Sequence, residues 1–484
     1  MIDLSAIEAS LVDDRIKGMP GGLMPIALSE IGRQGWNLLR EDLPLPLAVI
    51  RATALAHNGD WMRRFLGRSG AVIAPHGKTT MSPQLFQRQL DDGAWGITIG
   101  SVQQLQAIRH AGVQRVVMAN QLIGKRAMRY VLAELARDPD FDFYALADSE
   151  ANVAQLVAAA REASIGRPLQ LLVEGGILGA RTGARDLETA LGVARAIKAA
   201  EPYLALRGVE GYEGILRGAD NADTESRVAR FLDFLAEIAL ACAREALFAP
   251  GTVLLSAGGS TFYDMVVERF RAADLKRRFL ALTRSGCYLT HDSGSYRERF
   301  ATLRRRHPEV DDLGPGLEPA LEVWAYVQSR PEPGKVILTM GRRDVSFDSR
   351  LPEAERWFRP APGASTTDLR PVGPGHVAMG DDVTLVPDRR ADRQGLVDLG
   401  MDGAGFGAQR RPAALSLDRA MGRIGAGLQH ACACALRHLV EPVLQSLGTD
   451  PDGLEEDVVA GIARHGTGSL RKRSGSPRRC RSSR

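Results

Sequence analysis

Between Ala71 and Thr290, short apolar runs alternate with longer stretches in which apolar residues recur every three or four positions. The short runs are rich in β-branched residues and predict buried strands, whereas the longer stretches predict amphipathic helices. The predicted strands are residues 72–74, 96–99, 116–119, 143–146, 169–173, 206–211 and 253–256. The predicted helices are residues 101–110, 150–163, 186–200 and 224–246, with Ser101, Ser149 and Asp186 standing where N-caps belong.

Alternating strands and helices predict parallel pairing, because a parallel crossover needs about a helix's length of chain. About eight repeats of roughly 25–30 residues match the arithmetic of a (β/α)8 barrel. We therefore predict an α/β fold with such a barrel. An open doubly wound sheet has the same alternation and remains the structural alternative.

The pattern changes on both sides of this region. Leu43–Ile50 predicts a strand with prolines at its entry, followed by a helix over 53–66. Beyond about residue 312, the runs 320–327 and 335–340 alternate in part, which is typical of antiparallel β structure. The predicted divisions are an N-terminal leader (1–43), a barrel domain (44–312), a mainly-β domain with an atypical ending (313–415), and a helix-like segment with a basic, disordered tail (416–484).

Composition and charge narrow the possible partners. The chain has 484 residues, 44% hydrophobic and 25% charged, as in an ordinary globular protein of two domains. No apolar run approaches the roughly 18 residues of a membrane span, and no secretory signal is seen. Five cysteines do not make a disulfide framework, which favours a cytoplasmic location. The net charge of +4 includes seven basic residues after residue 466, so the body carries −3 and gives no reason to expect nucleic-acid binding.

Candidate chemistry begins with a lysine at the end of the first barrel strand. The apolar run Ala71–Ala74 is ended by Pro75 and Gly77, and Lys78 follows. Active sites of barrels lie at the carboxyl ends of their strands. A lysine held there in a dry pocket has a lowered pKa and a nucleophilic amine. By itself, however, a lysine after a strand is ordinarily a surface residue.

Resemblance to a known family favours the functional interpretation. Pro75-His76-Gly77-Lys78-Thr79 resembles the signature of the fold-type III pyridoxal 5'-phosphate (PLP) enzymes of the D-threonine aldolase and D-serine dehydratase group. The following residues, 80–83, most resemble the bacterial amino acid deaminase branch. The resemblance implies that Lys78 forms a Schiff base with PLP, and that His76 lies beside it. It also implies a leader packed on the β domain, and a homodimer.

Other strand ends carry the remaining predicted site residues. The resemblance implies that Arg181 faces the pyridine nitrogen of PLP and that Tyr288, in an Arg-x-Gly-x-Tyr segment, lies near its phosphate. Tyr212 ends a strand and can pack on the ring or hydrogen-bond a ligand. The segment 256–261 is the best phosphate candidate, because glycines after a late strand let backbone N–H groups approach an anion at a helix N-terminus. Its predicted ligand-binding residues are Gly258, Gly259 and Ser260.

Two further side chains near the last strand have ordinary interpretations. Cys287 is expected to be a small buried hydrophobe and His291 a surface residue. Metal-dependent relatives carry a His-x-Cys or His-x-Asp pair in the β domain, and none occurs between residues 349 and 415. His430 and Cys432 have this spacing but stand in a helix-like run, where residues two apart point to different faces. We therefore predict no metal ligand, although the resemblance allows zinc or another divalent ion.

The resemblance fades after about residue 389, and one hypothesis is that a shifted reading frame has replaced the ordinary end of the β domain. If so, metal binding would be compromised. Translation of the other two frames of the gene tests this hypothesis.

The leading functional prediction is a PLP-dependent deaminase of D-3-hydroxy amino acids, such as D-serine or D-threonine, giving a 2-keto acid and ammonia. The same site could break Cα–Cβ, which is the aldolase outcome. A PLP-binding protein without turnover and a phosphosugar barrel enzyme without PLP are further alternatives. A racemase is disfavoured, since no second base is seen for the opposite face.

Overall fold

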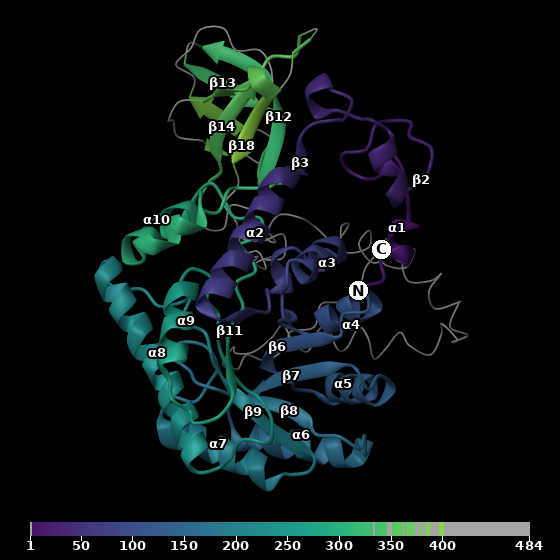
Figure 1. Cartoon of the computed structure of the whole chain (residues 1–484). Helices are drawn as coiled ribbons and strands as arrows, with labels where there is room; N and C mark the ends of the chain where they lie inside the picture. Colours follow the sequence, from purple (N-terminus) through teal and green to yellow (C-terminus); the bar gives the residue numbers. More distant parts are fainter. Residues whose placement is uncertain are drawn as a thin grey trace, which may run out of the picture. The chain divides into compact units, whose positions relative to one another are not determined.

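The computed structural model describes residues 2–332, 334–345, 351–361, 363–364, 366–372, 378–379, 384–387 and 396–400. The predicted segment 416–484, the pair His430 and Cys432, and most of the stretch 349–415 lie outside these residues. Figure 1 shows two sheets, one surrounded by helices and one formed by the later strands.

Eight parallel strands form the first sheet, in the order β4-β11-β10-β9-β8-β7-β6-β5. The strands are β4 (Val72–Ile73), β5 (Ile97–Ile99), β6 (Arg115–Gln121), β7 (Asp142–Ala147), β8 (Leu169–Glu174), β9 (Leu204–Gly211), β10 (Val253–Ala257) and β11 (Phe279–Thr283). A parallel bridge between His76 and Thr98 joins the two edges, and the Thr98 N–H donates to the Pro75 carbonyl over 2.9 Å. The predicted barrel is therefore confirmed, and the open-sheet alternative is wrong.

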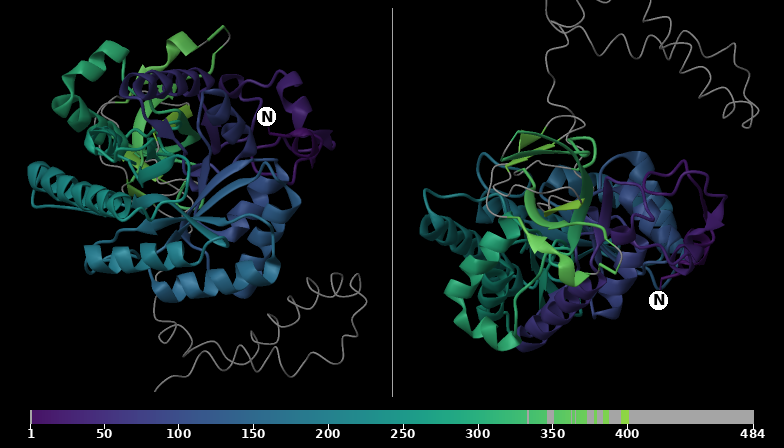
Figure 2. Two further views of the ribbon diagram at one scale, coloured as in Figure 1. Left: turned by 60° about the horizontal axis from the view of Figure 1, so that its bottom comes forward. Right: turned by 90° about the horizontal axis from the view of Figure 1, so that it is seen from above.

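Helices cover the outer face of this sheet (Figures 1 and 2). They are α2 (Ala52–Ser69), α3 (Pro83–Asp91), α4 (Val102–His110), α5 (Lys125–Arg137), α6 (Glu150–Ala163), α7 (Leu187–Ala199), α8 (Asn221–Arg244), α9 (Tyr263–Ala272) and α10 (Ser295–Arg306). The side chains of Ser101, Ser149 and Asp186 each accept a hydrogen bond from the backbone N–H three residues later. These three predicted N-caps thus satisfy donors that a helix leaves free at its start.

The second sheet is antiparallel and confirms the predicted C-terminal β region. Its strands are β3 (Leu47–Ile50), β12 (Leu321–Glu332), β13 (Lys335–Leu338), β14 (Glu353–Phe358), β15 (Arg370–Pro371), β16 (Ala378–Met379), β17 (Thr384–Pro387) and β18 (Leu396–Gly400). A small core under it includes Val323, Ala325, Val336, Leu338 and Met340.

Strand β3 belongs to this second sheet, although the predicted boundary at residue 44 assigned it to the barrel. Leu47 pairs with Trp324 of β12, and Ile50 pairs with Leu321. The physical reason is visible in its burial, which alternates between half-buried and exposed positions. That pattern suits an antiparallel strand with one solvated face, whereas barrel strands are buried on both faces.

The N-terminal segment contacts the helical layer of the barrel and the second sheet. It contains α1 (Ser5–Glu8), a hairpin of β1 (Leu11–Val12) and β2 (Ile26–Ala27), and the short helices η1 (Leu28–Arg33) and η2 (Leu38–Arg40). Leu38 and Leu39 pack beside Trp324 and Phe358 of the second sheet. At the other end, the Asp3 N–H donates to the carbonyl of Ala111, next to α4.

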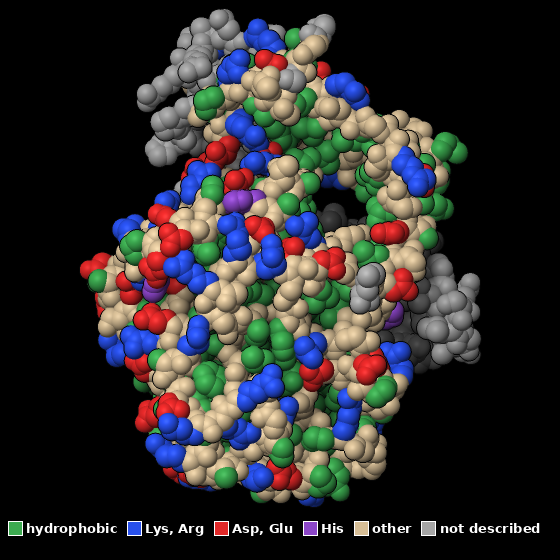
Figure 3. All heavy atoms as spheres, viewed as in Figure 1, with side chains coloured by type: hydrophobic (Ala, Val, Ile, Leu, Met, Phe, Trp, Pro, Cys, Tyr) green, Lys and Arg blue, Asp and Glu red, His purple; other side chains and the backbone are tan. Residues whose placement is uncertain are grey.

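On the face shown in Figure 3, Lys and Arg side chains are interspersed with Asp and Glu rather than gathered in one patch. Among the described helices, none is long and apolar enough to cross a membrane.

Candidate active site

Lys78 and His76 are positioned by a short turn at the carboxyl end of β4. The His76 N–H donates to the carbonyl of Arg284 over 3.1 Å, which ties the chain to the end of β11. The turn η3 (Gly77–Thr79) then begins, and the Lys78 N–H donates to Nδ1 of His76 over 3.3 Å. Since Nδ1 accepts this bond, the neutral imidazole carries its proton on Nε2.

Burial and nearby cations lower the pKa values of both side chains. The pKa of His76 lies well below its usual value, first through burial and then through Lys78, Arg284 and Arg181. The pKa of Lys78 is also lowered, mainly by desolvation and further by the two arginines. Lys78 still reaches solvent at the barrel mouth, so its pocket is less dry than the sequence led us to expect. The amine therefore has an increased neutral fraction together with access from outside.

Three buried carboxylates and one arginine lie at the ends of β8, β9 and β11. Arg284 donates to Oε1 of Glu210 and, over 3.0 Å, to the Gly211 carbonyl. Burial raises the pKa of Glu210 to about 8, and it also raises the pKa values of Glu174 and Glu213. Sequence reasoning missed this group. The sequence feature that could have revealed it is an acidic residue at the carboxyl end of an apolar strand, since a buried charge is rare unless it is paired.

The glycine segment after β10 forms a close turn, as predicted, but one of its backbone N–H groups bonds to Glu213. A Cβ at Gly258 would lie 2.3 Å from Cδ2 of Tyr212, so only glycine lets this ring lie so close. The Gly259 N–H, predicted to face a phosphate, donates instead to Oε1 of Glu213 over 2.7 Å. The reason is that Glu213 is fully buried and takes the nearest backbone donor. The hydrogen-bond donors that remain for an anion are Ser260 and the backbone N–H groups at the start of α9, which no side chain caps.

The two predicted aromatic residues have different surroundings. The Tyr212 ring centroid lies 5.7 Å from the guanidinium carbon of Arg181, an exposed loop residue at the same mouth. Tyr288, by contrast, is buried in the barrel core, and its hydroxyl hydrogen-bonds with Gln89 of α3. Tyr288 nevertheless lines the same small cavity as Ser260 and Thr261, so it lies near the predicted phosphate segment although its hydroxyl contacts Gln89.

Tyr296, at the start of α10, is the tyrosine that reaches the loop. Its hydroxyl hydrogen-bonds with Ser260 and with Cys287, and burial raises its pKa well above the usual value. Sequence reasoning missed it because both tyrosines follow β11 and only the fold of the segment between them decides which one turns inward.

Cys287 is half-buried, whereas His291 is buried. Sγ of Cys287 lies 3.7 Å from Oγ1 of Thr79, and burial raises the pKa of the thiol, as expected for an inert side chain. His291 is only 2% exposed, and burial lowers its pKa to about 4. The prediction of a surface histidine was wrong, because Asp292 and the ring of Phe300 enclose it.

A metal site is not formed by the part of the chain that the structure describes: no group of three or more His, Cys, Asp or Glu side chains is close enough to hold an ion.

Glu210 gives a test in the pH dependence of folding. Its folded pKa of about 8 lies above the ordinary value of 4.5, so its stabilisation is fully present below pH 4.5 and is lost as the pH rises to about 8. We expect Glu210→Gln to flatten the decline of the free energy of unfolding across this range, measured by urea titration. Glu162→Gln, at an exposed ion pair, is the control and should run parallel to wild type. A wild-type slope in E210Q would contradict the assignment.

Comparison with known proteins places this geometry in a family. Residues 50–293 match the alanine racemase N-terminal domain family, and residues 320–443 match a serine dehydratase domain family. The second match continues past residue 389, so the resemblance does not fade where the sequence suggested, and it includes His430 and Cys432. A curated relative, the D-threonine aldolase of Arthrobacter sp, is 26% identical over 331 residues, covering 68% of this chain and 79% of the relative.

Solved structures agree with the fold. The D-threonine aldolase from Filomicrobium marinum has 22% identity and a TM-score of 0.56, covering 74% of this chain and 87% of its own. The D-threo-3-hydroxyaspartate dehydratase from Delftia sp. HT23 has 18% identity and a TM-score of 0.55, covering 76% and 93%. With half of the sequence matched and the lysine at the end of the first barrel strand, the chain belongs to the alanine racemase N-terminal domain family.

Proposed function

We propose that this protein is a PLP-dependent lyase that acts on D-3-hydroxy amino acids. The observation that carries the proposal is the Lys78 amine, which has a lowered pKa and lies at the barrel mouth beside a neutral His76. Relatives named as an aldolase and as a dehydratase support the lyase class. Family membership makes a phosphosugar enzyme without PLP less attractive.

The chain has polar groups that fit this cofactor. Buried side-chain atoms that have no hydrogen-bond partner among the described residues gather at the ends of β9, β10 and β11: Glu210 Oε2, Glu213 Oε2, Ser256 Oγ, Thr283 Oγ1 and Ser285 Oγ. A buried polar atom without a partner costs about 1–3 kcal/mol, so such a concentration is typical of a site that takes a polar ligand. Lys78 would hold the cofactor covalently, Ser260 and the start of α9 would bind its phosphate, and Arg181 would face its ring nitrogen. When bound, PLP supplies an electron sink for charge that develops at Cα.

Proton transfer in the proposed reaction is assigned to residues of this chain. In the proposed reaction, the neutral Lys78 amine accepts the Cα proton from the face that a D-amino acid presents. Desolvation lowers the lysine pKa, and Arg181 and Arg284 lower it further, which keeps the base available. His76, neutral and with its Nδ1 bonded to the backbone, offers an Nε2–H as a donor rather than a second base.

Deamination is the leading outcome, and aldol cleavage is the alternative that the Arthrobacter relative favours. Incubation with D-serine and D-threonine tests the choice. We expect a 2-keto acid and ammonia in equal amounts, with L-enantiomers as the control. Glycine plus an aldehyde would replace the deaminase proposal with the aldolase. Cofactor absorbance with neither product would indicate a PLP-binding protein without turnover.

We also propose a cytoplasmic homodimer that binds no nucleic acid. Sedimentation of the holoenzyme tests the assembly; a monomer would contradict the dimer.

A further inference from the structure

A small cavity of about 120 Å³ lies between the starts of α8 and α9 and one side of α10. Hydrogen-bond donors line most of it. The polar lining residues include Arg217, Thr224, Thr261, Arg299 and Arg306, together with one carboxylate, Glu225, which is paired with Arg306. Because one water takes up about 30 Å³ of liquid, the cavity has room for a small oxyanion but not for a nucleotide.

Arg217 and Arg299 give this cavity an uncompensated positive charge. Neither has a carboxylate within ion-pair distance among the described residues, whereas Arg306 is paired with Glu225 and Asp264. The two free cations are close enough for Arg299 to lower the pKa of Arg217, in addition to the effect of burial. Two like charges kept together without an anion are unfavourable, and an oxyanion between them would remove the repulsion.

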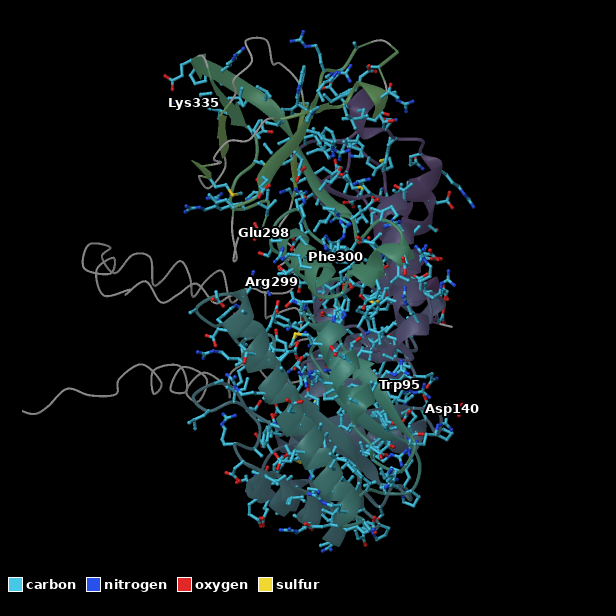
Figure 4. The ribbon with its side chains drawn as sticks, turned by 60° about the vertical axis from the view of Figure 1, so that its left-hand side comes forward. Trp95, Asp140, Glu298, Arg299, Phe300 and Lys335 are labelled. Atoms are coloured by element: carbon cyan, nitrogen blue, oxygen red, sulfur yellow. The ribbon has the colours of Figure 1, made fainter. Side chains whose placement is uncertain are left out.

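Hydrogen bonds to other parts of the chain hold both guanidinium groups in place. Arg217 donates to the carbonyls of Gly214 and Leu216, over 3.0 and 2.6 Å. Arg299 donates to Oγ1 of Thr261 over 3.3 Å. Its neighbour Phe300 packs on Trp61, with ring centroids 5.3 Å apart. Figure 4 labels Arg299 and Phe300 on α10. The arginines are therefore preorganised, and each has N–H groups left to donate.

The cavity adjoins the site proposed for the cofactor but does not include its lysine. Lys78, His76 and the buried carboxylates Glu174, Glu210 and Glu213 do not line it. Thr261 and Arg299 are shared, because they also line the small cavity that contains Ser260 and Tyr296.

We propose that this cavity is a second anion site, which binds a small oxyanion of the phosphate or carboxylate class through Arg217 and Arg299. Since Arg299 also contacts Thr261, an anion bound here fixes the residue that follows Ser260 in the glycine segment. The proposal does not depend on the lyase reaction.

Calorimetric titration of the PLP-loaded protein with inorganic phosphate, and separately with malonate, tests the proposal. We expect saturable binding of at least one of them, weakened about tenfold or more in Arg299→Met and in Arg217→Met. Arg269→Met, at an exposed ion pair with Asp233, is the matched control and should bind as wild type does. The stronger of the two ligands identifies the anion class.

Three results would overturn the proposal. One is the lack of saturable binding below about 10 mM, which is weaker than an ordinary specific site. Another is equal affinity in wild type and in both variants. The third is binding seen only in protein stripped of PLP and displaced by PLP, which would make the cavity part of the cofactor site.

Discussion

Lys78→Ala should abolish turnover, with a loss of about a thousandfold or more, because it removes both the covalent attachment and the proposed base. Borohydride reduction of the wild-type protein with PLP, followed by peptide mapping, should place the adduct on the peptide that contains Lys78. The variant should give no adduct there. Its folding free energy should change by less than about 0.5 kcal/mol, since the side chain reaches solvent and has no ion-pair partner among the described residues.

The control for this experiment is Lys335→Ala, on β13 of the second sheet, which Figure 4 labels far from α10. It should keep full activity and the same adduct. A reduced adduct on another lysine, or activity of K78A within tenfold of wild type, would refute the assignment of Lys78.

Gly286→Ala should both destabilise the protein and displace the lysine. A Cβ at Gly286 would lie 2.4 Å from the carbonyl oxygen of His76 and 2.6 Å from Oγ1 of Thr79. The first of these is a backbone atom, which cannot rotate away, so the segment after β11 must move from the end of β4. Overpacking of this kind costs about 1–3 kcal/mol. Urea unfolding measures the loss, and the yield of the borohydride adduct reports the displaced amine.

Gly67→Ala is the matched control, because it is the same substitution at a position in α2 with nothing within 4 Å of the new Cβ. Inside a helix it should leave stability unchanged or raise it by up to about 1 kcal/mol. If G286A unfolds at the same urea concentration as G67A and keeps the adduct, the close approach of the two strand ends has no importance for the site.

Local patterns in the sequence predicted one part of the candidate site and missed another. His76 and Lys78 were found because the motif, the strand that precedes it and the turn that follows are contiguous in sequence. Glu213 and Tyr296 were missed because their roles depend on contacts with Gly259 and Ser260, which lie 46 and 36 positions away. Their side chains carry no periodic signal of such contacts.

The sequence by itself determined the alternation of strands and helices, the helix starts and the place of the candidate lysine, because strand and helix periods and N-caps are properties of neighbouring residues. Closure of the sheet into a barrel was decided by the contact between His76 and Thr98 at its two edges. Only the tertiary structure decided that β3 pairs with β12, that His291 is buried, and that the hydroxyl of Tyr296 rather than that of Tyr288 bonds to Ser260. Periodicity states which face of an element is buried. It does not state which partner covers that face, since pairing depends on the packing of segments that are distant along the chain.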